Sequence, residues 1–167
     1  MSLRGATLID FTGAVKPGGH DSFNEAVVKL IRSGGSKTVV IVDRGSCMQL
    51  AQPHLVTDHI NLTGTNPLCG PNDPCGERFP VVNEIYHNTT GDEIIDKLPR
   101  GVAAGLKSGV VPREEEMTKL KSLGADFCCY NLVPAMIVAA HAGLKVIGIV
   151  LPDGKVDANV AARLRGE

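Results

Sequence analysis

The residues best suited to covalent chemistry are two adjacent cysteines, Cys128 and Cys129, and a downstream histidine, His141. A thiol beside an imidazole can serve as a nucleophile that the imidazole activates as a base. Neighbouring residues of a strand point to opposite faces, so only one of these thiols can face a given histidine. All three residues lie in apolar segments, where buried cysteines are mostly unreactive. We therefore expect packing roles rather than a catalytic dyad.

Motifs for metals and nucleotides are absent from the sequence. The cysteines form no CxxC pair and the histidines show no H-x-x-x-H spacing, so we expect no metal site. The glycine pairs at 18–19 and 34–35 match neither the dinucleotide fingerprint nor the P-loop. The three glutamates at 114–116 are interpreted as a solvated helix start, where acidic charge complements the helix dipole. Generic motifs therefore do not identify a reaction.

The elements that would position these residues alternate between strands and helices. The period of the apolar residues predicts strands at 6–11, 37–43, 54–60, 100–106, 126–130 and 144–151, and helices at 21–33, 112–123, 134–142 and 158–164. This alternation is typical of an α/β fold with a largely parallel sheet. Residues 61–80 are rich in Gly, Pro and Asn, which predicts a long loop that is functional or belongs to an interface.

Composition limits the classes of protein that this chain can represent. Its 167 residues, 43% of them hydrophobic and 21% charged, suit one globular domain, which we assign to residues 1–167. The 17 Lys and Arg residues against 18 Asp and Glu residues leave no basic excess for nucleic acid. We find no apolar run long enough for a membrane span and no secretion signal, so we expect a cytoplasmic protein without nucleic-acid or membrane partners.

Two sets of residues carry a more specific signal. The first is Val-Thr-Asp-His-Ile-Asn-Leu-Thr-Gly-Thr-Asn-Pro-Leu-Cys-Gly-Pro-Asn at 56–72, followed by Gly-Glu-Arg-Phe-Pro at 76–80. The second is Leu-Gly-Ala-Asp at 123–126, Val-Pro at 133–134, Ile-Val-Ala at 137–139, His141, and Gly-Leu-Lys-Val at 143–146. With their spacing, these stretches resemble the signature of the trimeric purine nucleoside phosphorylases over nearly the whole chain.

This resemblance implies a three-layer α/β sandwich with a central mixed, largely parallel sheet, and a homotrimer. It also implies cleavage of purine nucleosides by phosphate, which yields the base and ribose 1-phosphate with phosphate as co-substrate and no resident cofactor. Such chemistry needs a cradle of N–H groups and basic side chains for phosphate, and hydrogen-bond donors at the purine, which gathers negative charge as it leaves.

Most positions that the family uses for substrate differ in this chain. The family's first strand and Gly-rich phosphate loop lie upstream of residue 1, and its Gly-Arg-Phe-His segment falls near residues 5–8, where Arg and His are replaced. Its Asn-Ala-Ala turn aligns with residues 43–45, which places an Asp where phosphate would bind and leaves Arg44 as a candidate phosphate contact. The purine-binding Glu and Asn fall at Pro112 and Gly154, and a late His that contacts the ribose falls at Val160.

A few substrate candidates remain. Phe79 matches the aromatic residue that the family donates to a neighbouring subunit's ribose pocket, although it would equally pack the subunit interface. Tyr130 replaces a Met on the ribose face, and Asn131 follows it as a further substrate-binding candidate. Asp153 lies beside the lost Asn and would protonate a purine if burial raised its pKa, but an Asp before Gly is also a common turn former.

We therefore expect a purine nucleoside phosphorylase-like protein, shortened at its N-terminus, that has lost most substrate contacts and shows weak or no phosphorolysis. It would bind a purine or nucleoside, or act through its trimer interfaces. One alternative is an active phosphorylase or nucleosidase in which Arg44 holds the anion and Asp153 is the acid. Another is a subunit that joins a full-length relative in a mixed trimer.

Overall fold

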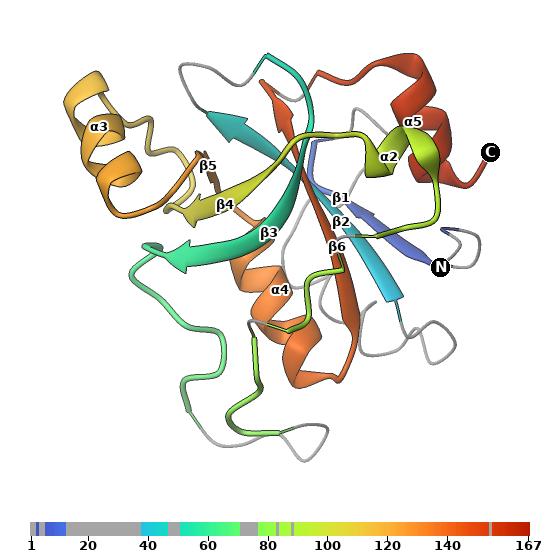
Figure 1. Cartoon of the computed structure of the whole chain (residues 1–167). Helices are drawn as coiled ribbons and strands as arrows, with labels where there is room; N and C mark the ends of the chain where they lie inside the picture. Colours follow the sequence, from blue (N-terminus) through green and yellow to red (C-terminus); the bar gives the residue numbers. More distant parts are fainter. Residues whose placement is uncertain are drawn as a thin grey trace.

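The computed structural model describes residues 3, 6–12, 38–46, 51–70, 77–82, 84–87, 89–153 and 155–167. Within these ranges the chain forms six strands and four helices (Figure 1). In chain order they are β1 (Thr7–Asp10), β2 (Thr38–Ser46), β3 (His54–Asn61), α2 (Glu93–Asp96), β4 (Arg100–Gly105), α3 (Glu114–Ser122), β5 (Phe127–Cys129), α4 (Leu132–His141), β6 (Lys145–Pro152) and α5 (Ala158–Arg165).

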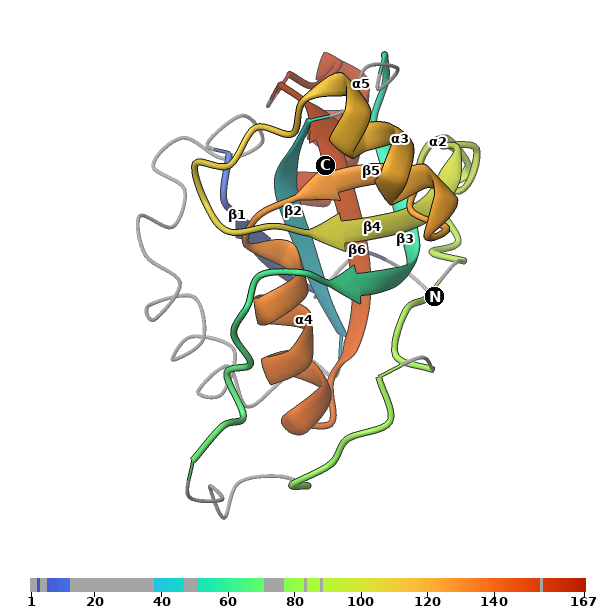
Figure 2. The ribbon, with the colours of Figure 1, turned by 90° about the vertical axis from the view of Figure 1, so that its left-hand side faces the viewer.

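All six strands belong to one sheet, and that sheet closes on itself. The parallel pairs are β1–β2, β2–β6, β3–β4 and β4–β5, whereas β2–β5 and β3–β6 are antiparallel. Because β2 pairs with both β5 and β6, the strands β2, β5, β4, β3 and β6 form a ring (Figure 2). The expected α/β class and mixed, largely parallel sheet are confirmed. The expected three-layer sandwich is not confirmed. Such a sandwich has an open sheet between two helical layers, whereas this sheet closes like a barrel.

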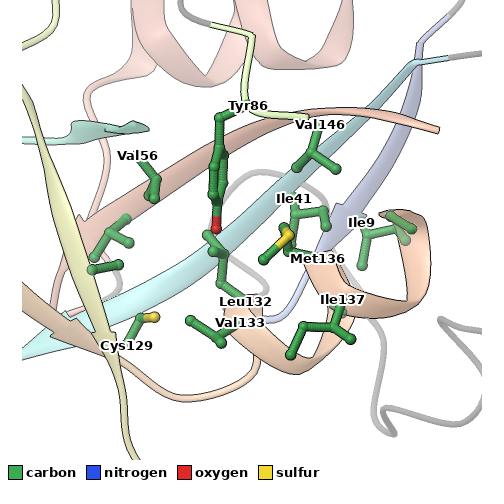
Figure 3. Close-up of a cluster of buried hydrophobic side chains, with 14 of the residues drawn as sticks. Ile9, Ile41, Val56, Tyr86, Cys129, Leu132, Val133, Met136, Ile137 and Val146 are labelled. Carbon is green, nitrogen blue, oxygen red and sulfur yellow. The ribbon is translucent and has the colours of Figure 1, made fainter. Parts of the chain in front are cut away.

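The helices cover different sides of this ring. α4 packs on a cluster that includes Ile9, Ile41 and Tyr86 (Figure 3). α2 and α5 lie together over a second cluster, and α3 covers a third. α4 and the pair α2 and α5 thus lie on different sides of the sheet (Figure 1).

The sequence of β2 explains why it is central. Val39 and Ile41 face the α4 cluster, whereas Val40 and Val42 face the cluster of α2 and α5. A strand that is covered on both faces must be apolar at every position, which is the pattern of its first half. Gly105 explains how α4 approaches β4 closely, since a Cβ at this position would lie 2.7 Å from the Cβ of Val133.

Element positions agree with the sequence predictions within a few residues, apart from one missed helix. β5 is shorter than the predicted strand at 126–130, and α4 begins at Leu132 rather than at residue 134. The short helix α2 was not predicted; Asp92 caps it by accepting hydrogen bonds from the N–H groups of Ile94 and Ile95. The helix predicted at 21–33 lies outside the described residues. In the part of the chain that the structure describes, no helix has the length and apolar character needed to span a bilayer.

Candidate functional site

Strand pairing brings several predicted site residues to one end of the sheet. At the end of β2, Gly45 pairs with Cys129 on one side and with Pro152 on the other. The N–H of Asp153, which follows β6, lies 3.4 Å from the carbonyl oxygen of Gly45. Arg44, Tyr130 and Asp153 therefore lie on segments that meet at this end, although they are far apart in the sequence. We call this region the strand-end site.

Asp43 is the centre of the strand-end site. Its side chain is 0% exposed, and its Oδ2 accepts hydrogen bonds from three consecutive backbone N–H groups, those of Tyr130 at 2.9 Å, Asn131 at 2.6 Å and Leu132 at 2.9 Å. Its Oδ1 accepts from the N–H of Arg44 at 2.9 Å and from Nδ2 of Asn131 at 3.5 Å. Five donors therefore surround this one carboxylate. We call the N–H groups of residues 130–132 the amide cradle.

Helix α4 explains why the carboxylate is placed there. Its first turn contains no acidic residue, and Asn131, the N-cap, makes no capping bond with its own side chain. The first N–H groups of a helix lack partners within the helix and carry partial positive charge. Asp43, 88 residues before Asn131, supplies the missing acceptor and the missing negative charge. Burial raises the pKa of Asp43, while its backbone hydrogen bonds act in the opposite direction.

The side chains of the other predicted residues differ in their exposure. The Arg44 side chain is exposed, and Tyr130 and Asn131 are half-buried. Asp153 is exposed and has a positive φ of 48°, the left-handed conformation that its predicted turn role requires. Because Asp153 is exposed, the described part of the chain does not provide the burial that its proposed role as an acid needs.

Phe79 lies at the opposite end of α4 from the strand-end site. Its segment is attached there by His141, the last residue of α4, whose Nδ1 donates a hydrogen bond to the Glu77 carbonyl oxygen at 2.7 Å. Phe79 is 83% exposed, and the guanidinium of Arg78 lies 5.8 Å from its ring centre. The structure therefore does not bring Phe79 together with Arg44, Tyr130, Asn131 and Asp153 within one chain.

The expected packing roles of the cysteines and of His141 are confirmed. Cys128 and Cys129 are buried on different clusters, and the Cys128 thiol donates to the Met117 sulfur at 3.6 Å. Burial, and then the charge of Asp43, raises the pKa of the Cys129 thiol well above its usual value, so it stays protonated. His141 is buried and its Nδ1 is already bonded to Glu77. A thiolate–imidazole dyad therefore does not form.

The loop after β3 is ordered by the side chain of Asn61. Asn61 Nδ2 donates to the Thr65 carbonyl oxygen at 3.0 Å, and Oδ1 accepts from the N–H of Thr63 at 3.1 Å. The loop borders an open hollow of about 560 Å³ that Asn61, Asn66 and Cys69 help to line. These contacts hold the start of the loop that the sequence predicts at residues 61–80. Among the described residues, no group of three or more His, Cys, Asp or Glu side chains could hold a metal ion.

Comparison with known proteins identifies the scaffold. No family model matches the chain. Purine nucleoside phosphorylase 1 of Bacillus subtilis is 36% identical over 104 residues, which cover 57% of this chain and 38% of the relative. Purine nucleoside phosphorylase of Mus musculus is 32% identical over 146 residues, 77% of this chain and 50% of the relative. The chain is related to the purine nucleoside phosphorylase family.

Solved structures agree on the fold of this purine nucleoside phosphorylase relative. Schistosoma purine nucleoside phosphorylase in complex with guanosine matches with a TM-score of 0.67 at 21% identity, covering 81% of this chain and 56% of that chain. The chain spans between 38% and 59% of the length of the curated relatives named purine nucleoside phosphorylase 1. The relationship thus identifies a shared scaffold over about half of a typical relative.

Sequence reasoning noted Asp43 only as a charge that would repel phosphate. Its bonds to the amide cradle were missed, and so was its function as the acceptor at the start of α4. One signal could have suggested them: a single acidic residue ends the apolar run of β2, and the apolar helix α4 has no acid of its own in its first turn.

Proposed function

We propose that this chain is a purine nucleoside phosphorylase-like protein that binds a purine or nucleoside at the strand-end site, with weak or no phosphorolysis. The observation that carries the proposal is the saturation of the amide cradle by Asp43. The relatives at 32–36% identity support a nucleoside ligand. We also propose, from the sequence expectations, a cytoplasmic location and no resident cofactor.

The chemistry of phosphorolysis explains the expected loss of rate. A phosphate dianion needs N–H donors and positive charge, but the three cradle N–H groups already bond to a carboxylate. The leaving purine needs a donor, and the exposed Asp153 carboxyl offers no buried acid. Loss of one such stabilising group commonly lowers turnover by roughly 10²–10³-fold, so loss of several leaves little catalysis.

Inosine binding and turnover test the proposal together. Purified protein is incubated with inosine and phosphate, and hypoxanthine is measured by chromatography; binding of inosine is measured separately by equilibrium dialysis. We expect saturable binding with turnover far below the roughly 1–10³ s⁻¹ of ordinary enzymes. Turnover in that ordinary range, or the absence of any inosine binding, would refute the proposal.

An active phosphorylase with rearranged groups is the second candidate. The exposed Arg44 at the end of β2 and the left-handed Asp153 on the adjoining segment favour it, because both side chains are available to a ligand. This candidate predicts hypoxanthine release that Arg44→Ala or Asp153→Asn abolishes while the fold, measured by circular dichroism, is unchanged. Release that persists in both variants would exclude Arg44 and Asp153 as the catalytic pair.

Assembly into a homotrimer is the remaining part of the proposal. Its support is the large exposed area of Phe79 together with the exposed Val81 two residues later, since exposed apolar side chains of this kind often mark interfaces. Native mass spectrometry distinguishes a homotrimer from a monomer. Co-expression with a full-length relative tests for a mixed trimer by the same measurement.

A further inference from the structure

We propose that Asp43 determines the ligand class of the strand-end site: its carboxylate is a built-in anion that keeps phosphate and other small anions out of the amide cradle. The site would then accept an uncharged base or nucleoside. This inference rests on the proposed function for the identity of the ligand, but not for the exclusion of anions.

The geometry of the amide cradle is that of an anion site. Three consecutive N–H groups at the start of the ten-residue helix α4 converge on the single atom Oδ2 of Asp43. Helix N-termini bind phosphate and sulfate oxygens in this way, because N–H groups and the helix dipole both favour negative charge. Here the bound oxygen belongs to the chain itself.

A free anion cannot easily displace this carboxylate. Asp43 belongs to β2, which pairs with β6 on both sides of this residue, from Thr38 to Gly45, so the carboxylate stays at the cradle. Its second oxygen is also occupied, by the N–H of Arg44 and by Nδ2 of Asn131. A second anion would therefore find the donors used and would be repelled by a buried charge of the same sign.

Arg44 does not cancel that repulsion inside the cradle. Successive residues of a strand point to opposite faces, and Asp43 points toward the start of α4. The Arg44 side chain thus leaves β2 on the other face, where it is exposed. Tyr130, whose N–H belongs to the cradle, is half-buried with its side chain partly packed on the cluster under α3, and an aromatic side chain of this kind suits an uncharged base.

Replacement of Asp43 tests the inference directly. Asp43→Gly removes the carboxylate and leaves a space bordered by the amide cradle, whereas Asp43→Asn keeps the volume and removes the charge. Asp157→Gly is the matched control, because Asp157 caps α5 with an exposed carboxylate that accepts from the N–H of Asn159 at 2.8 Å. Melting temperatures are measured for all four proteins in sodium formate, sodium phosphate and sodium chloride at equal ionic strength and pH.

We expect neither wild type nor Asp157→Gly to show a saturable rise of its melting temperature with formate or phosphate. In chloride, Asp43→Gly should melt at a lower temperature than wild type. Formate should raise the melting temperature of Asp43→Gly saturably, because an anion that binds only the folded protein stabilises it. If Asp43→Gly does not fold, Asp43→Asn carries the test, with a saturable rise in phosphate that wild type lacks. Absence of any formate or phosphate response in both Asp43 variants overturns the inference.

A further outcome separates this inference from the proposed function. A saturable phosphate response in wild type that is lost in Asp43→Asn would show that phosphate binds with the carboxylate in place, and would overturn the inference. If inosine fails to bind wild type but formate raises the melting temperature of Asp43→Gly saturably, the nucleoside proposal fails while the exclusion of anions by Asp43 stands.

Discussion

Removal of the Tyr86 hydroxyl should stabilise this protein. Tyr86 is only 6% exposed, and its hydroxyl finds no hydrogen-bond partner among the described residues (Figure 3). The ring itself is tightly packed, since a Cβ on Gly148 would lie 3.2 Å from its Cε1 atom. Tyr86→Phe keeps this packing and removes the hydroxyl, which gives up its hydrogen bonds to water when the chain folds. A buried polar group without a partner costs roughly 1–3 kcal/mol, so we expect the free energy of unfolding to rise by about that amount.

Urea unfolding followed by circular dichroism measures this change. The slope of free energy against urea should be equal in the two proteins, because the buried surface is the same, and the melting temperature should rise by about 2–4 °C for each kcal/mol. A loss of more than about 1 kcal/mol at equal slope would refute the reasoning, since it would mean that the hydroxyl makes a favourable hydrogen bond in the folded protein.

Alkaline titration gives an independent readout of the same group. Burial raises the pKa of Tyr86 well above 10, with smaller contributions from Cys129 and Asp58. The unfolded chain loses this proton near pH 10 while the folded chain keeps it, so the stability that Tyr86 contributes is full below pH 10 and falls as the pH rises further. Since the chain has two tyrosines and no tryptophan, absorbance of tyrosinate should account for at most one residue before unfolding. Tyr86→Phe should lack this alkaline loss.

Three further predictions concern single side chains. Desolvation is the largest single effect on the pKa of Asp96 and raises it, but hydrogen bonds from the N–H and the hydroxyl of Thr90, at 2.7 and 2.8 Å, and from the N–H of Gly91 together outweigh it and lower the pKa. Stability should therefore fall as the pH drops below about 4, and Asp96→Asn should remove that acid dependence in urea titrations. Gly105→Ala should cost about 1–3 kcal/mol, because the new Cβ would lie 2.7 Å from Val133, and an unchanged melting temperature would contradict this. Phe79→Ala should leave the stability of the single chain within about 0.5 kcal/mol, but should dissociate the proposed trimer in sedimentation experiments.

The sequence predicted those parts of the fold that depend on local pattern. The first half of β2 and most of β6 are apolar, and this pattern correctly indicated strands. The short helix α2 was missed because four residues are too few to show a helical period, although Asp92 is a typical cap. Closure of the sheet could not be predicted, because it depends on β2 and β3 each pairing with β6, and local pattern says nothing about such distant partners.

The candidate site was predicted in its parts but not in its organisation. Arg44, Tyr130, Asn131 and Asp153 lie on segments that meet at one end of the sheet, but their roles toward a substrate stay predictions. The bonds of Asp43 to the amide cradle span 87 to 89 residues, so no spacing rule reveals them. A charged residue at the end of an apolar strand shows only that it needs a partner. The partners of Asp43, the N–H groups at the start of α4, are found only once the position of α4 relative to β2 is known.

Helix α4 also determines how Phe79 can contribute to a nucleoside site. The ten residues of α4 extend roughly 15 Å at 1.5 Å per residue, with the amide cradle at the first and His141 at the last. His141 is hydrogen-bonded to Glu77, and Phe79 lies two residues after Glu77. Two extended residues span only about 7 Å. The backbone of Phe79 therefore cannot arrive at the strand-end site of its own chain while the bond between His141 and Glu77 is intact. In the proposed trimer, a ligand at that site would meet Phe79 of a second copy, so nucleoside binding that needs this ring should weaken when the protein is diluted below the concentration at which it assembles.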